Sequence, residues 1–252
     1  VWCGHLLLED GIGVDPEKIS AINSLKDPET YPELETLIGM CGWHNEFIKN
    51  YAALMLPLTR CLLGRRQGVK FICTPEMSNA FAQFKEQISR KIVLSRPGPG
   101  QYHCFVDMAD PAIGCHLIRI HEKKTYLMGY ASHCFSKSEM NYSAPKKEMY
   151  AIWFGGTKFR HYLRDNGSTI WTDLKSLADL HLHETKGIWA RWLSDIIELI
   201  VVVKNISGKK NVVADAISRL TPNQINALTL ESNIHDFFEP EIVQEITPGL
   251  FI

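Results

Sequence analysis

The sequence has no closely paired cysteines. Its seven cysteines stand at positions 3, 41, 61, 73, 104, 115 and 134, and no two of them have C-x-x-C spacing. An odd number without close pairs argues against a disulfide framework and against a zinc knuckle. We therefore expect reduced thiols that are mostly buried.

The sequence also lacks a long apolar run and an excess of either charge. The longest run, IIELIVVV at 196–203, is interrupted by Glu198 and is far shorter than the roughly 20 residues that span a bilayer. We therefore expect no membrane partner. The 27 basic and 28 acidic residues give a net charge of −1, so a nucleic-acid partner must be bound by local basic patches.

The 252 residues, 45% of them hydrophobic, are enough for a sizeable core in one large or two modest domains. The turn cluster SRPGPGQY at 95–102 is the best boundary. We predict a mainly helical module over 1–95, an α/β domain over 101–221, and an acidic linker or tail over 222–252. The opening residues VWCGHLLL suggest a strand, and we expect the chain to be a fragment of a longer protein.

Helix-start signals mark the first module. Asp15, Thr30 and Thr74 each stand where a side chain would cap a helix, and proline follows Asp15 and Thr74 directly. Behind Thr74, apolar residues recur at helical spacing. They are Ala80, Phe81, Phe84 and Ile88.

The second module alternates strand and helix patterns. Its expected strands are 102–107, 113–120, 125–132, 168–172 and 199–206. Its expected helices are 143–159, a short one after Asp173, and 211–220. This order is typical of an α/β fold with a mixed sheet and flanking helices.

Four acids stand at element ends or on a packed helix face. Asp107 ends the apolar run HCFV, which suggests a carboxylate buried at a strand edge, and Asp173 ends STIWT. Glu148 shares a helix face with the small residues at 144, 151 and 155, so we expect it to point at the sheet. Asp215 lies one turn into the last expected helix.

Each acid also has an ordinary structural explanation. Asp107 can precede a turn, Asp173 can cap a helix, Asp215 can favour a helix N-terminus, and Glu148 can be solvated. Together they share one purpose, because converging carboxylates repel one another unless divalent cations lie among them. Mg²⁺ prefers such hard oxygen ligands, and two ions can clamp the attacking and leaving oxygens of a phosphodiester.

Residues 1–221 resemble the C-terminal part of a gypsy-type LTR-retrotransposon reverse transcriptase that runs into its ribonuclease H domain. The stretches that carry the resemblance are CGHLLLEDGIGVDPEKISAI (3–22), LETLIGMCGWHNEFIKNYAALMLPLTRCL (34–62), FICTPEMSNAFAQFKEQI (71–88), YASHCFSKSEMNYSAPKKEMYAI (130–152), FRHYL (159–163), WTDLKSL (171–177), ARWLSDI (190–196) and GKKNVVADAISRL (208–220).

The resemblance implies a thumb/connection module over 1–95 and a ribonuclease H-like fold after it. It places the family's four metal-binding, catalytic acids on Asp107, Glu148, Asp173 and Asp215. The implied reaction is hydrolysis of the RNA strand of an RNA–DNA hybrid with two Mg²⁺ or Mn²⁺ ions. The polymerase's paired-aspartate motif does not occur in the sequence, so we expect no DNA polymerisation by this chain.

The resemblance also implies partners and a location. The partners are an RNA–DNA hybrid, template–primer, and the remaining parts of a Pol polyprotein, namely palm, fingers and integrase. The location is intracellular and cytoplasmic, with virus-like particles as one setting. Basic residues near the acids in sequence are candidates for phosphate contacts. They are Lys146, Lys147, Lys158, Arg160, Arg164, Lys209 and Lys210.

The sequence departs from the family at several places. Val106 and Ala109 replace the usual Thr and Ser around the first acid, Lys146 replaces an acid, and NISG at 205–208 replaces Arg-Pro-Gly. None of these changes removes a metal ligand, but they call the family's loop geometry and substrate grip into question for this chain. The alternative to an enzyme is therefore a non-catalytic hybrid-binding or protein-interaction scaffold from a decayed or domesticated element.

Overall fold

The computed structural model describes residues 1, 3–65, 68–164, 167–173 and 187–205. Its helices are α1 (Pro16–Ser24), α2 (Tyr31–Gly42), η1 (Asn45–Phe47), α3 (Tyr51–Leu54), α4 (Leu56–Arg65), α5 (Pro75–Ile88), η2 (Glu139–Asn141), α6 (Ala144–Lys158), α7 (Arg160–Leu163) and α8 (Ile188–Glu198). Its strands are β1 (His5–Leu7), β2 (Gly11–Val14), β3 (Val93–Ser95), β4 (Gln101–Ala109), β5 (Ala112–His121), β6 (Lys124–Cys134), β7 (Thr169–Thr172) and β8 (Val202–Asn205).

The predicted caps of the first module are confirmed. Asp15 and Thr30 accept hydrogen bonds from the backbone N–H of Glu17 and Glu33, at 3.0 and 3.4 Å. Thr74 likewise accepts one from Met77 N at 3.4 Å, and the apolar stripe behind it is buried. These side chains satisfy amide groups that have no partner inside the helix.

Two strands of the first module were not predicted. β2 and β3 join β1 in an antiparallel sheet of order β1-β2-β3. β2 is the Gly-rich segment GIGV, and β3 lies beside the expected domain boundary. Their pairing brings together segments about 80 residues apart (Gly11↔Ser95), which local patterns do not reveal.

The second module contains a five-stranded mixed sheet of order β6-β5-β4-β7-β8. The pairs β4–β5 and β5–β6 are antiparallel, whereas β4–β7 and β7–β8 are parallel. The mixed α/β prediction is therefore confirmed. Helix α8 was not predicted, although Trp189, Trp192 and Ile196 give it a buried stripe at helical spacing.

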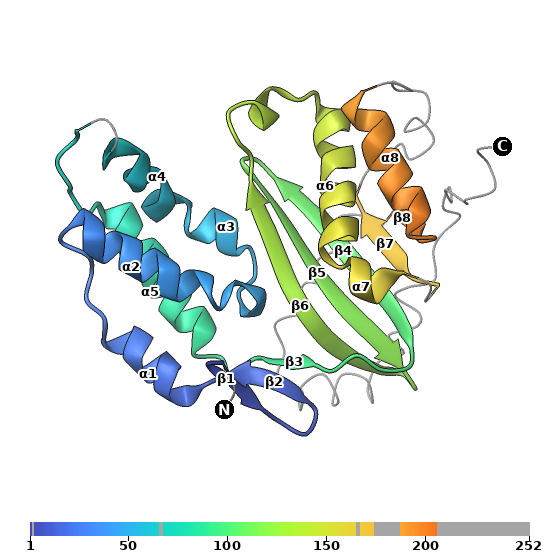
Figure 1. Cartoon of the computed structure of the whole chain (residues 1–252), viewed down its shortest axis with the longest axis horizontal. Helices are drawn as coiled ribbons and strands as arrows, with labels where there is room; N and C mark the ends of the chain where they lie inside the picture. Colours follow the sequence, from blue (N-terminus) through green and yellow to red (C-terminus); the bar gives the residue numbers. More distant parts are fainter. Residues whose placement is uncertain (2, 66–67, 165–166, 174–186, 206–252) are drawn as a thin grey trace.

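Apolar cores lie on both faces of the sheet, and Figure 1 shows α6 and α8 over one of these faces. Helices α6 and α8 pack on one face, where Cys104 and Val106 are buried. Phe105, between them in β4, belongs to the other core, which Trp171 also joins and which the N-terminal helices complete. This alternation explains why the end of β4 reads as a continuous apolar run. Of the seven cysteines, only Cys41, Cys104 and Cys115 are fully buried, so the expectation of mostly buried thiols was too strong.

Helix α6 lies unusually close to β4 at Gly155. A Cβ at this position would be 2.9 Å from Val106 Cγ2 and 3.2 Å from Cys104 Sγ. A methyl group would therefore require the β-branched Val106 to move. In contrast, Gly39 of α2 is exposed and faces open space.

We predict that Gly155→Ala lowers the free energy of unfolding by about 1–2 kcal/mol, because overpacking outweighs the gain in helix propensity. The matched change Gly39→Ala should raise it by about 0.5–1 kcal/mol. Urea unfolding followed by circular dichroism measures both. An equal gain in the two variants would contradict the close packing of α6 on β4.

Candidate functional site

Two of the predicted acids lie side by side at the edge of the large sheet. The parallel pairing of β4 with β7 ends at Phe105↔Trp171. Two residues further along each of these segments stands an acid, Asp107 after Phe105 and Asp173 after Trp171. Neighbouring strands are about 4.8 Å apart. The shared register therefore brings these two carboxylates next to each other.

Glu148 reaches the same edge from α6, which packs across β4 and β7. Ala151 on its helix face is buried and Gly155 touches β4, as expected of a small-residue stripe. Ala144, which we expected on the same stripe, is exposed. It is the first residue of the helix, so the buried part of the stripe begins further along. Glu148 itself is half-buried.

Electrostatics connect the three acids. Desolvation, and then the negative charge of Asp173, raise the pKa of Asp107, against the opposing charge of Lys49. Desolvation and Asp173 also raise the pKa of Glu148. Asp173 thus lies within electrostatic reach of both other carboxylates. Binding of a proton or a cation, which reduces the negative charge, is therefore favoured at this site.

Asp107 is exposed, so the expectation of a buried carboxylate was wrong. The run HCFV is buried, but β4 continues beyond it to Ala109, and Asp107 lies in this less buried part of the strand. Nearby protein atoms still desolvate the carboxylate enough to raise its pKa. This position leaves Asp107 accessible to a ligand from solution.

The fourth predicted acid, Asp215, lies outside the described residues. Among the residues that the structure does describe, no group of three or more His, Cys, Asp or Glu side chains is arranged to hold a metal ion. The donor chemistry of Asp107, Glu148 and Asp173 nevertheless suits a divalent cation, since all three are hard oxygen ligands whose repulsion a cation would relieve.

The structure places the predicted basic residues unevenly. Lys147 is buried and its Nζ lies 3.0 and 3.1 Å from the two carboxylate oxygens of Asp110, so it serves an internal ion pair. Arg160 bonds Glu198 at 2.8 Å, whereas Lys158 is exposed. Lys146 stacks over the Tyr142 ring at 4.3 Å, and Arg164 approaches Glu198 at 4.0 Å. Lys209 and Lys210 lie outside the described residues.

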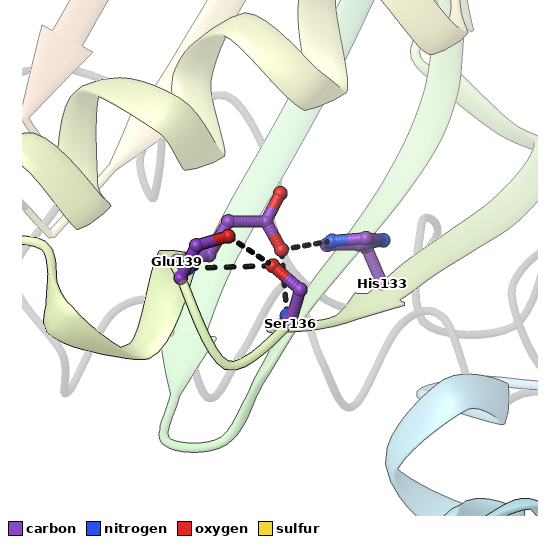
Figure 2. A network of polar contacts seen from close by, with 4 residues as sticks. His133, Ser136 and Glu139 are labelled. Atoms are coloured by element: carbon purple, nitrogen blue, oxygen red, sulfur yellow. Dashed lines mark hydrogen bonds and ion pairs between the residues drawn. The ribbon is translucent and has the colours of Figure 1, made fainter.

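A polar network holds the loop that leads into α6 (Figure 2). Glu139 Oε2 accepts a hydrogen bond from Ser136 N at 2.6 Å and lies 3.0 Å from His133 Nε2. The Ser136 hydroxyl in turn accepts from Glu139 N at 3.3 Å. This reciprocal arrangement fits the S-x-x-E pattern of a capping box, which is visible in the sequence but was not singled out.

Burial opposes ionisation of Glu139, but hydrogen bonds from Ser136, His133 and Tyr150 outweigh it and lower its pKa to about 2. The loop therefore depends on a charged carboxylate. Because α6 carries Glu148, this network helps to fix the position of the third acid.

Residues 100–199 match the family described as the RNase H-like domain found in reverse transcriptase. Over this stretch the chain resembles an RNase H-like domain. In the wider chain, the retrovirus-related Pol polyprotein from transposon 297 of Drosophila melanogaster is 33% identical over 225 residues, which are 87% of this chain and 20% of that protein. The Tf2-3 transposon polyprotein of Schizosaccharomyces pombe is 27% identical over 274 residues, 98% of this chain and 20% of that protein.

The predicted resemblance to the Pol polyproteins of retrotransposons is confirmed by these relatives, of which the chain spans about a fifth to a quarter. Among solved structures, foamy viral protease-reverse transcriptase dRH in complex with double-stranded DNA aligns with a TM-score of 0.69 and 16% identity, over 81% of this chain and 37% of that one. Foamy viral protease-reverse transcriptase in complex with an RNA/DNA hybrid aligns with a TM-score of 0.65 and 15% identity, over 82% of this chain and 29% of that one. These structures establish the likeness in fold. Among the described residues, no helix is long and apolar enough to cross a membrane.

We predict that Glu139→Gln lowers the free energy of unfolding by about 1–2 kcal/mol at pH 7, because hydrogen bonds to a charged group are lost. A lowered pKa stabilises the fold fully above the carboxyl's ordinary value of 4.5, and this contribution falls as pH drops toward 2. Urea unfolding between pH 7 and pH 3 should show the wild-type advantage shrinking with acid. The exposed Glu122→Gln should show no such trend, and a difference for Glu139→Gln that stays constant with pH would refute the charged network.

Proposed function

We propose that the chain is the ribonuclease H segment of a retrotransposon reverse transcriptase and that it hydrolyses the RNA strand of RNA–DNA hybrids. The observation that carries this proposal is the alignment of Asp107 with Asp173, with Glu148 in electrostatic reach, at one edge of an RNase H-like sheet. Relatives that are Pol polyproteins support it, as does the similar fold of a reverse transcriptase solved with an RNA/DNA hybrid.

Asp107, Glu148 and Asp173, with Asp215, would hold the divalent cations. Bound there, Mg²⁺ or Mn²⁺ would supply activation of water and stabilisation of the leaving 3′ oxygen. The carboxylates would hold the cations at the sheet edge, where Asp107 is exposed to solvent. The ribose 2′-OH distinguishes the RNA strand from DNA.

The proposed partners are a hybrid or template–primer and the rest of a Pol polyprotein. The proposed setting is the cytoplasm, including virus-like particles. A non-catalytic hybrid-binding scaffold is the second candidate. It is favoured by the lack, within the described part of the chain, of three side chains already arranged around one ion.

We predict that Asp107→Asn abolishes hybrid cleavage, with a loss of at least about 100-fold, because the loss of a ligand should exceed the roughly 10–100-fold effect of an outer-shell change. Both proteins should bind the hybrid, and only the RNA strand should be cut, only with divalent metal. A strand-labelled gel assay measures this, with Asp10→Asn, an exposed acid of the first module, as the matched control. Binding without cleavage by the folded wild type in Mg²⁺ and Mn²⁺ would favour the scaffold.

A second prediction concerns stability. Without metal, mutual repulsion among the acids destabilises the charged site, so Asp107→Asn should melt slightly above wild type. Mg²⁺ or Mn²⁺ should raise the melting temperature of wild type, because a ligand that binds only the folded state stabilises it. Differential scanning calorimetry should show a smaller rise in Asp107→Asn and a full rise in Asp10→Asn; an equal rise in all three would place the ions elsewhere.

A further inference from the structure

The turn before α3 rests on the large sheet in the same cross-strand row as Asp107. Gly114 of β5 pairs with Asp107 on one side and with Ser132 of β6 on the other. A Cβ at Gly114 would lie 1.9 Å from Asn50 Oδ1, so only glycine leaves room for this amide. Ala52 N donates to Ser132 Oγ at 2.8 Å. The first module is therefore docked directly beside the acidic edge.

The docked turn has a defined conformation. Asn50 adopts φ 52° and ψ 34°, the left-handed region, which asparagine tolerates better than most residues. Lys49 precedes it, and the positive charge of Lys49 reaches both Asp107 and the buried His116. A cation from the first module thus lies within electrostatic reach of Asp107, although nearly 60 residues separate the two in sequence.

A cleft of about 350 Å³ opens on the same turn, between the first module and β6. It is lined by Lys49, Asn50, Leu54, Gln83, Gln87, Arg90, Ile92 and Tyr130. Two of these side chains are cations and three are amides, and none of the described lining residues is acidic. Such a surface suits an anion that accepts several hydrogen bonds.

A nucleic-acid phosphodiester fits this chemistry best. Phosphate oxygens accept hydrogen bonds from Lys, Arg and Gln side chains, and such contacts position a strand without reading its sequence. Asn50 lines the cleft and lies against Gly114, the strand partner of Asp107. A backbone held in the cleft would therefore be held close to the carboxylates.

We propose that the cleft formed by Lys49, Gln83, Gln87 and Arg90 is a phosphodiester-binding subsite that holds a nucleic-acid backbone next to the acidic edge. The identity of this ligand rests on the proposed function. Arg90 is bonded to Glu86 at 2.9 Å, and both side chains are exposed, so Glu86 competes with phosphate for the Arg90 guanidinium.

The test is binding of a labelled RNA–DNA hybrid and of a DNA duplex, in EDTA, at 50–200 mM salt. Lys49→Met and Arg90→Met should each weaken binding of both duplexes severalfold at low salt and reduce the slope of log K against log salt by about one, since each phosphate contact releases about one counterion. Glu86→Gln should bind more tightly than wild type. Lys49→Arg, which keeps the positive charge, should bind as wild type does. The matched control is Lys124→Met, at the far end of the same sheet, with binding unchanged.

Several results would overturn the subsite. They are an unchanged slope in both Met variants, an equal loss in Lys124→Met, or no binding by wild type. Circular dichroism and the melting temperature of each variant verify its fold, and the gain expected for Glu86→Gln cannot arise from unfolding. Because cleavage is not measured, binding that depends on Lys49 and Arg90 supports the subsite even if the nuclease proposal fails.

Discussion

The parallel pairing of β4 with β7 is the constraint on which the site depends. It places Asp107 and Asp173 at equivalent positions on neighbouring segments, where desolvation and then the like charge of Asp173 raise the pKa of Asp107. The fold can keep such a pair because large apolar cores lie on both faces of the sheet behind it. Burial elsewhere thus offsets a locally unfavourable edge, an arrangement expected where a protein must present charge to a ligand.

The position of the third acid, Glu148 on α6, depends on two further features of the fold. The close contact at Gly155 brings the helix against β4, and the charged Glu139 holds the loop that leads into the helix. On the other side of the sheet, Gly114 accepts Asn50 and lets the first module reach the same edge. Absent side chains at two glycines therefore allow both the helix and the docked turn to lie close to the acids.

Local signals predicted much of this architecture. Caps at Asp15, Thr30 and Thr74 depend on a few neighbouring residues, so they could be found from spacing alone, as could the long strands of the sheet. The alignment of Asp107 with Asp173 followed from strand ends. The exposure of Asp107 did not follow, because exposure depends on tertiary packing that local spacing does not report. The role of Lys49 had no sequence signal, since it arises from a tertiary contact, and Asp215 lies outside the described residues.

In the proposed function, Asp107, Glu148 and Asp173 act together on one divalent-cation site. Crystals of the protein soaked in Mn²⁺ test it most directly, through anomalous diffraction that locates manganese independently of any activity. We predict manganese bound by carboxylate oxygens of these residues, with roughly 3.5–4 Å between the ions if two bind. Manganese found only at other surfaces, with the carboxylates of Asp107 and Asp173 uncoordinated, would contradict it.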